Sequence, residues 1–382
     1  PRTGAPFFDD AIFSVQPRFY HKYREIGDGQ ISEATTGGGT LSFESGWLAD
    51  KLRITLTGFT SQKFYGPEDR DGTGLLRENQ QSYTVLGEAF GEFKLREDTS
   101  VFAGRTPLSL PFINGDDTRM TPNTFQAAGI RSMAIPNLQV AAGHAGRIRF
   151  RTSSDFVPMS EHAGALGTDR GVSVLGARYN FSEDVYIGLI DQYGWDMFNT
   201  VYAESAYLFN LTDDLDLRIG GQFTDQRSVG DGLLGEFNAQ SAGVKAALGF
   251  EGIILSGAYT WTADDDQIRN PWGGSPLYNS SMIADFDRAG EESAKVGLSY
   301  DMSRIGLDGL AASASWVVGN TPDSGRVASP DQQEFNVTVD YRPDIDFLDN
   351  FWFRVRYASN NGDAGGIDSS DFRVILNYSY SF

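Results

Sequence analysis

The sequence predicts an all-β fold, a single transmembrane antiparallel β-barrel of about 18 strands with short periplasmic turns and long extracellular loops. Three observations support this prediction. The final stretch, FRVILNYSYSF, alternates between an apolar, aromatic face and a mostly polar face, as a strand between lipid and water does. Similar alternating segments recur along the chain, with short turns and longer polar loops between them. No apolar run approaches the roughly 20 residues of a membrane-spanning helix.

A soluble β-sandwich is the alternative fold for such a chain. It rarely ends on three aromatic residues of one face, here Tyr378, Tyr380 and Phe382, because they would leave an exposed, sticky edge. In a closed barrel the last strand pairs with the first, and these aromatic residues lie at the lipid interface. We therefore predict a barrel over residues 11–382 in the outer membrane of a Gram-negative bacterium, preceded by an N-terminal periplasmic segment, 1–10. Because the sequence begins at Pro1 without a leader, we expect a mature form whose signal peptide is absent.

Composition narrows the functional classes. The 382 residues include no cysteine, which excludes a disulfide scaffold and a thiolate metal site. The formal net charge of −20 argues against nucleic acid as a partner. Only three histidines are present, and no nucleophile with a neighbouring base is visible, so we do not expect an enzyme. No cofactor is predicted either.

The N-terminal part of the chain supplies the first three predicted strands. The first lies near 11–24, where Pro17 predicts a bulge or a locally unpaired site because proline has no N–H to donate. The second and third form a hairpin, 40–48 and 52–60, around a short turn at 49–51. A polar, glycine-rich stretch follows from Tyr65 to Gln81.

The same layout repeats through the rest of the chain. Further short turns are predicted at Arg96–Asp98, Ile135–Asn137, Ser182–Asp184, Asn210–Asp214, Gly249–Gly252, Met302–Gly306 and Arg342–Asp349. Longer polar segments are predicted at 105–124, 147–170, 226–237, 262–290, 319–331 and 358–370. Short turns at one end and long loops at the other are typical of an outer-membrane barrel.

Two of the long loops are unusually apolar. The segment 105–124 contains PLSLPFINGDD, and the segment 262–290 contains Trp272, Leu277 and Phe286. Such loops need a surface against which to bury. We therefore predict that both, the third and the seventh loops, fold into the barrel lumen and narrow the pore. Packing among the outer loops at the mouth is the alternative.

Basic side chains dominate the predicted lumenal face, although the chain has 51 acidic and 31 basic residues. A cation on the lipid face costs about 2–4 kcal/mol at the midplane, which explains why these side chains face inward but not why they outnumber the acids there. Closure of the barrel would join Arg18, Arg24, Arg354, Arg356 and Arg373 in one strip. The predicted basic ladder along the substrate pathway is Arg18, Lys22, Arg24, Arg53, Arg354, Arg356 and Arg373.

Bases on the middle strands have a different predicted role. They are Arg178, Arg218, Lys245 and Lys295. We expect them to pair with the wall acids Glu204 and Asp216, because a pair within the wall leaves neither charge uncompensated. The acidic run 264–266 could bind calcium, but its spacing matches no calcium-loop motif, and a solvated loop is the simpler interpretation.

Four stretches resemble the OprD family of substrate-specific outer-membrane porins, the carboxylate channels of pseudomonads and their relatives. They are FFDDAIFSVQPRFYHKYRE, LPFINGDDTRMTPNTFQAAG, DFDRAGEESAKVGLSYDMSRIGLDGL and FLDNFWFRVRYA. The resemblance implies an eighteen-stranded barrel, inward third and seventh loops, and a lumenal basic ladder that guides carboxylates to a constriction. By that resemblance Arg18, Arg24, Arg354 and Arg356 match ladder positions. The constriction residues that we expect are Asp116, Asp117, Arg119, Asp285 and Arg288.

Together these features predict facilitated, passive uptake of small carboxylate-bearing solutes such as aromatic acids or amino acids. The alternative is a general diffusion porin for small hydrophilic solutes. A metal-carrier receptor is excluded by our expectation of only about ten residues before the first strand, too few for a plug domain. The other predicted partners are outer-membrane lipid and lipopolysaccharide, with the barrel a monomer or a weakly associated trimer.

Overall fold

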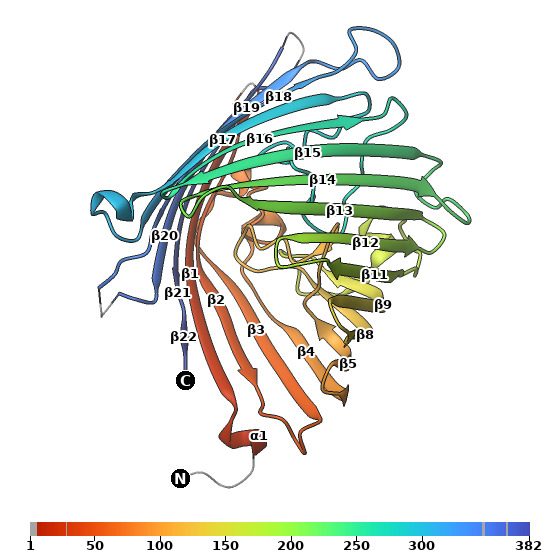
Figure 1. Ribbon diagram of the computed structural model, residues 1–382, viewed down its shortest axis with the longest axis vertical. Coiled ribbons are helices and arrows are strands. Elements are labelled where there is room, and N and C mark those ends of the chain that lie inside the picture. The colour runs from red at the N-terminus through yellow and green to blue at the C-terminus, as the bar shows by residue number, and fades with distance from the viewer. Residues whose placement is uncertain (1–5, 28, 346–347, 364–365) are drawn as a thin grey trace.

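The protein is described by a computed structural model that covers residues 6–27, 29–345, 348–363 and 366–382. It is a closed antiparallel β-barrel of 18 wall strands (Figure 1). The wall strands are β1 (Ile12–Ile26), β2 (Gln30–Glu44), β3 (Leu52–Tyr65), β4 (Tyr83–Arg96), β5 (Thr99–Thr106), β8 (Thr124–Ile135), β9 (Leu138–Arg149), β11 (Val172–Asn180), β12 (Val185–Gly194), β13 (Phe198–Asn210), β14 (Leu215–Ser228), β15 (Asn238–Phe250), β16 (Ile253–Thr262), β17 (Glu292–Asp301), β18 (Leu310–Asn320), β19 (Gln332–Tyr341), β20 (Phe351–Gly362) and β21 (Ser369–Tyr378). β22 (Tyr380–Ser381) continues β21, and β10 (Val157–Pro158) is a short strand beside β9.

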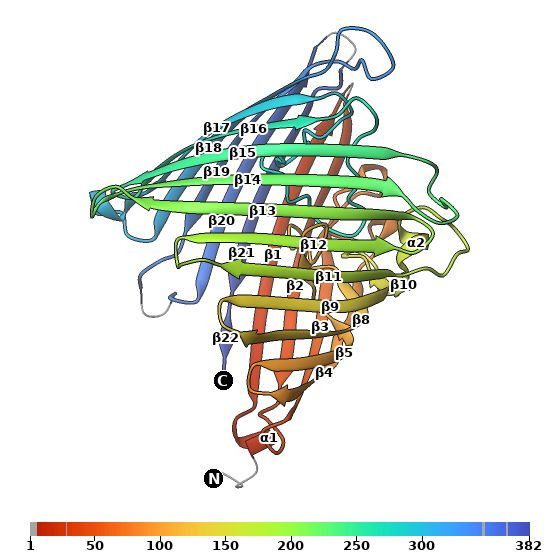
Figure 2. The same ribbon diagram turned by 45° about the vertical axis from the view of Figure 1, so that its right-hand side comes forward.

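The barrel closes between its two ends, as the sequence predicts. β1 pairs with β2 on one side and with β21 and β22 on the other, which Figure 2 shows as adjacent red and blue strands. The backbones of Phe13 and Phe382 exchange two hydrogen bonds of 3.0 and 2.9 Å, and their rings stack with centroids 5.7 Å apart. Pro17 lies between the β1–β21 and β1–β22 pairings, because a residue without an N–H interrupts the ladder.

The predicted period-two facing is confirmed on the last strand. Phe372 and Leu376 are exposed on the outer face, whereas Asp371, Arg373 and Ile375 are buried. Exposed large apolar side chains continue around the barrel, for example Leu175, Val244, Leu255 and Leu298. A belt of this kind is stable only against lipid.

The prediction for the second strand was wrong at its start. We expected 40–48, whereas β2 runs from Gln30 to Glu44 and pairs along its whole length with β1. Its first ten residues, QISEATTGGG, lack the apolar alternation on which the prediction relied. Gly39, at φ 128°, has no room for a side chain, since a Cβ there would lie 2.0 Å from the backbone oxygen of Gln16.

Helices are few and short. α1 (Pro6–Asp9) and α2 (Met159–His162) have four residues each, and no helix among the described residues is long and apolar enough to cross a membrane. Of the predicted N-terminal segment 1–10, residues 1–5 lie outside the described residues, and 6–9 form α1. That this segment is periplasmic stays a prediction.

Candidate functional site

The third and seventh loops meet each other inside the barrel. The third loop (107–123) contains the short strands β6 (Ser109–Leu110) and β7 (Ile113–Asn114), and the seventh spans 263–291. The Asn114 amide nitrogen donates to the Gly274 carbonyl at 3.0 Å, and the Gly274 N–H donates to the Asn114 side-chain oxygen at 2.8 Å. The two loops therefore form one partition across part of the lumen.

Apolar side chains attach this partition to the wall at β9–β13. Phe112 and Ile113 of the third loop and Trp272 and Leu277 of the seventh are buried in one cluster with wall residues. Trp272 stacks on Phe198 with centroids 5.0 Å apart, and its indole N–H donates to the Met159 carbonyl at 2.9 Å. The apolar content of both loops is thus buried against the inward face of the wall. That the partition is the narrowest point of the pore stays a prediction.

The second loop (66–82) also packs onto the inner wall, which the sequence analysis missed. Leu75, Leu76 and Met120 are buried with Tyr20 and Ile375 on the β1–β21 side. The loop is polar and glycine-rich overall, so its average composition hid the adjacent leucines. These two leucines are the signal that could have identified it.

Strand register brings part of the predicted basic strip together. Arg356 is paired with Arg373, and Arg373 with Lys22, across β20, β21 and β1. Arg119 of the third loop joins them, since its guanidinium donates at 3.1 Å to the Thr73 carbonyl, which also accepts from Lys22 at 3.2 Å. Four cations from three wall strands and a loop therefore surround one buried carboxylate, Asp371.

Several members of the strip are already paired. Asp371 accepts two hydrogen bonds from Arg373 at 2.7 and 3.1 Å and lies 3.4 Å from the Lys22 ammonium. Lys22 and Arg373 are only 1% and 2% exposed. They can act on a passing solute through their charge but not by contact. Their place in the substrate pathway stays a prediction.

Two other ladder arginines are also bound to carboxylates. Arg18 binds Asp117 of the third loop through both terminal nitrogens, at 2.6 and 3.1 Å. Arg354 holds Asp340 at 2.7 and 2.9 Å and lies over the Trp352 ring. Each pair leaves little uncompensated charge.

Arg356 and Arg24 are the ladder arginines without a carboxylate partner in the described part of the chain. Arg356 donates only to the Thr338 hydroxyl, at 3.3 Å, and the Arg24 Nε has no partner. Arg53 is different, since it lies between Glu44 and Glu92 at 2.8 and 2.7 Å. Arg53 therefore contributes no surplus positive charge.

The expected pairing of the middle-strand bases is not found. Within the described residues, neither Glu204 nor Asp216 forms an ion pair with a base. Lys295 instead donates to the carbonyl of Ser280 at 3.0 Å and the hydroxyl of Ser281 at 3.3 Å in the seventh loop. Arg178 lies 3.6 Å above the Tyr186 ring. Arg178 is aligned with Glu204 through Gly188 of the intervening strand, and Arg218 lies two residues from Asp216 on β14, so alignment on the wall does not by itself produce these ion pairs.

Constriction candidates of the third loop are held by arginines. Asp116 pairs with Arg151 and Asp117 with Arg18, whereas Arg119 donates only to oxygens of Thr73 and Thr118. Burial, with Arg373 and Arg151 nearby, lowers the pKa of Arg119 to about 9, so it stays protonated at neutral pH. Both loop acids are thus paired, whereas Arg119 forms no ion pair within the part of the chain that the structure describes.

Constriction candidates of the seventh loop are bound within loops. Asp285 accepts from Asn270 and Ser280, and Arg288 binds Glu291 and the eighth loop at Ser329. Burial and the carboxylates of Asp285 and Glu291 raise the pKa of the neighbouring Asp287 well above its ordinary value. The structure therefore does not bring Asp285 and Arg288 into the Arg119 cluster.

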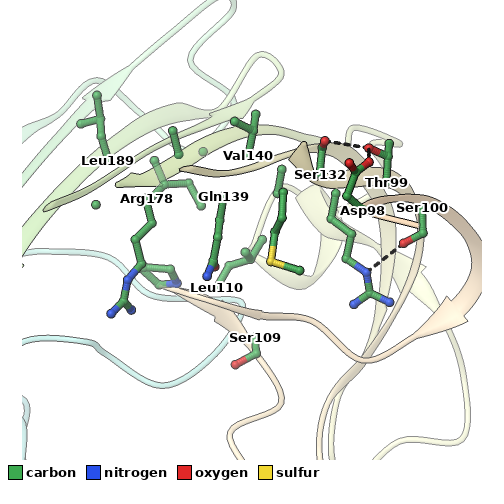
Figure 3. A pocket seen from close by; sticks show the side chains of 18 of the residues that line it. Asp98, Thr99, Ser100, Ser109, Leu110, Ser132, Gln139, Val140, Arg178 and Leu189 are labelled. Carbon is green, nitrogen blue, oxygen red and sulfur yellow. Dashed lines mark hydrogen bonds between the residues drawn. The ribbon is translucent and has the colours of Figure 1, made fainter. Parts of the chain in front are cut away.

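Two of the cavities in the described part of the barrel lie against different stretches of its wall. The larger, about 660 Å³, lies between the third loop and β4–β13 and is lined by Leu110, Pro111, Met133 and Ile190, among others. Figure 3 shows Arg178 and Gln139 extending into it toward Leu110. The smaller, about 320 Å³, lies under the seventh loop on β16–β20 and is lined mostly by hydroxyl groups with Lys295 and Arg356.

The acidic run 264–266 is bound by neighbouring loops. Asp265 and Asp266 accept hydrogen bonds from Asn238 at 3.0 and 3.1 Å. The part of the chain that the structure describes holds no group of three or more histidine or acidic side chains that could hold a metal ion.

Comparison with known proteins places this barrel in a family. Residues 5–382 match the family described as outer membrane porin, OprD family. Porin D of Pseudomonas aeruginosa is 22% identical over 408 aligned positions, which cover 98% of this chain and 92% of the relative. Porin-like protein GalP of Pseudomonas putida is 24% identical and is covered over 93% of its length, against 98% of this chain.

Solved structures of other porins share this fold along nearly the whole chain. The crystal structure of Pseudomonas aeruginosa OccK9 (OpdG) has a TM-score of 0.91 at 26% identity, covering 98% of this chain and all of that one. A BenF-like porin from Pseudomonas fluorescens gives 0.90 at 22% identity with the same coverage. With the family match over residues 5–382, the closed barrel and its inward loops, the chain belongs to the OprD family of outer-membrane porins and is a channel rather than an enzyme.

Proposed function

We propose that this porin is selective for small carboxylate-bearing solutes, such as aromatic acids or amino acids, and that the lumenal basic ladder guides them passively through the barrel. The observation that carries the proposal is the charge of the strip. Together with Lys22 of the ladder and Arg119 of the third loop, the strip brings seven cations to this side of the lumen: Arg18, Lys22, Arg24, Arg119, Arg354, Arg356 and Arg373. The carboxylates paired with them are Asp117, Asp340 and Asp371. The surplus positive charge favours anions in a chain whose net charge is strongly negative.

Arginine suits this task physically. A carboxylate entering a narrow pore loses part of its hydration, and cations must replace the lost water. The guanidinium stays charged and offers a planar fork of donors to a carboxylate. One such contact in a wet lumen contributes only about 0–1 kcal/mol, so the solute can leave each site. A series of shallow sites thus combines attraction with release.

A relative offers support of the same kind. Pseudomonas aeruginosa OpdK, 20% identical with a TM-score of 0.88, has been crystallised with vanillate, which is a carboxylate. At that identity the likeness carries the fold, and the ligand belongs to the relative.

The test is a permeation survey in liposomes containing the full chain. Benzoate, a neutral amino acid and glucose are compared in wild type and in Arg354→Gln/Arg356→Gln. We expect the variant to slow benzoate well beyond glucose, and the difference to shrink as salt rises because screening weakens wet charge pairs. Equal slowing of both would favour the alternative, a general diffusion porin with weak selectivity.

We propose three further properties of this porin. The barrel occupies residues 11–382, it contacts lipid and lipopolysaccharide, and it is a monomer or a weakly associated trimer. Cross-linking in native membranes would distinguish those two states.

A further inference from the structure

The smaller lumenal cavity differs from the rest of the basic strip in its chemistry. Six serines and one threonine line it, together with Lys295, Arg356 and Asn336, and no acidic residue does. The wall carboxylate of Glu334, two residues from Asn336 on β19, points into the seventh loop, where it accepts backbone N–H bonds from Met282, Ile283 and Ala284 at 2.8, 3.1 and 2.9 Å. The cavity is therefore cationic and rich in hydroxyl groups.

Strand register orders these groups in a row. Ser299, Ser313, Thr338 and Arg356 are successive partners across β17, β18, β19 and β20. Their side chains share the inward face, since they continue the row that contains Arg373 and Lys22. Strand spacing places Thr338 about 5 Å and Ser313 about 10 Å from Arg356.

The row is open to a ligand. The two terminal nitrogens of Arg356 have no partner in the described part of the chain, because only its Nε is used, toward Thr338. The same holds for the hydroxyls of Ser299, Ser313 and Ser315. The side-chain oxygen of Asn336 is buried and also without a partner. A hydroxyl both donates and accepts, so a row of them matches another hydroxylated molecule.

We propose that this cavity is a binding subsite for hydroxylated carboxylates, of the sugar-acid or hydroxy-acid class. The carboxylate binds the open fork of Arg356, and the ligand hydroxyls lie along Thr338 and Ser313. A six-carbon acid spans the distance between these side chains, and a volume of about 320 Å³ lies within the range of small-molecule sites. The inference rests on the proposed carboxylate selectivity and narrows it to a substrate class.

Two acids with six-membered rings separate the contribution of the ligand's hydroxyl groups from that of its carboxylate. Glucuronate and cyclohexanecarboxylate each carry one carboxylate on a six-membered ring, but only glucuronate has hydroxyls. Their concentration dependence of permeation is measured in liposomes with the full chain, with glucose as the neutral reference. We expect glucuronate to half-saturate the wild type at a lower concentration than cyclohexanecarboxylate.

The test variant is Ser313→Ala/Thr338→Val. The matched control is Ser42→Ala/Thr57→Val, also a serine and a threonine paired in register on adjacent strands, but lining neither of the two cavities. Each hydrogen bond lost changes affinity by about two- to tenfold, so the test variant raises the half-saturating concentration of glucuronate by at least that factor. The value for cyclohexanecarboxylate and both values for the control stay unchanged.

A second variant guards against an indirect effect, because Thr338 also positions Arg356. Ser313→Ala/Ser315→Ala leaves the Thr338–Arg356 contact intact and is expected to act in the same direction. The subsite is rejected if both acids shift together, or if neither shifts, in these two variants. Failure of the underlying carboxylate selectivity has a different signature, since glucose would then pass the wild type as fast as both acids.

Discussion

The two sides of the lumen differ in chemistry although the same strand geometry builds them. On the β16–β20 side, inward positions carry serine, threonine and unpaired cations around a cavity of about 320 Å³. On the β4–β13 side they carry small and apolar residues around a cavity of about 660 Å³, and charges there are of both signs. The inward direction of a side chain in a barrel thus determines whether it faces the lumen, but not whether it is polar or apolar.

The difference between the two sides of the lumen suggests separate roles for them in binding a solute that has an anionic end and an apolar end. The polar side can hold the carboxylate, and the apolar side can hold a ring or an alkyl chain. The partition of the third and seventh loops is held to the apolar side by Trp272 and Phe112 and to the polar side by Lys295 and Glu334. Four measurements test these separate roles.

Removal of the partition tip should have the largest effect. Deleting Asn114–Asp117 removes the hydrogen bonds to Gly274 and the pairs with Arg151 and Arg18. We expect a several-fold rise in single-channel conductance and loss of selectivity on both sides. Deleting Asp323–Ser324 from the exposed eighth loop is the control and should leave conductance unchanged. An unchanged conductance in the first deletion would mean that the third loop does not limit the pore.

Single arginine substitutions should have the second-largest effect and should distinguish the unpaired arginine of the ladder from a paired one. Among the described residues Arg356 has no carboxylate partner, whereas Arg354 is compensated by Asp340. Arg356→Gln should therefore lower benzoate permeation about two- to fivefold, the equivalent of up to about 1 kcal/mol. Arg354→Gln is the matched control on the same strand and should change it less. If Arg354→Gln has the larger effect, charge surplus at Arg356 is not what attracts the anion.

The apolar side should respond with a smaller, complementary change. Met133 lines the larger cavity and is exposed, so we do not expect its replacement to disturb folding. Met133→Ser should reduce cyclohexanecarboxylate permeation about twofold, since part of one side chain's apolar contact is lost. Glucuronate should be unaffected. A loss for glucuronate alone would reverse the assignment of the two sides.

The smallest expected effect concerns the seventh loop, which lines the smaller cavity on the β16–β20 side. Burial and neighbouring carboxylates raise the pKa of Asp287 in the seventh loop. A raised pKa in an acid means that the folded loop is more stable with the proton bound, and that this stability is lost as pH rises from about 4 through the raised value. We expect the current noise of the wild type to be lowest at about pH 4 and to increase as the pH is raised. Asp287→Asn should show less difference, and an equal difference would exclude this carboxyl.

Part of the architecture follows from local patterns in the sequence. Alternation along 372–382 is a property of a single strand, so it predicts the facing of Arg373 and Phe372 without knowledge of any partner. The aromatic residues up to Phe382 predict that the sheet closes into a barrel, because on a free edge they would be exposed and prone to aggregation. The apolar content of the third and seventh loops predicts burial because apolar area avoids water wherever the loop lies.

Only the tertiary structure decided which charges remain unpaired. Arg18 is compensated by Asp117, about a quarter of the chain away, and Lys22 and Arg373 share Asp371 beneath a second loop that the sequence marked only as polar. Each pairing depends on strand register across the closure and on how far a loop enters the barrel. Both are set by contacts between residues distant in sequence, and no local pattern carries them. The same contacts leave Arg356 open beside a row of hydroxyls, which is why the character of the candidate site became visible only in three dimensions.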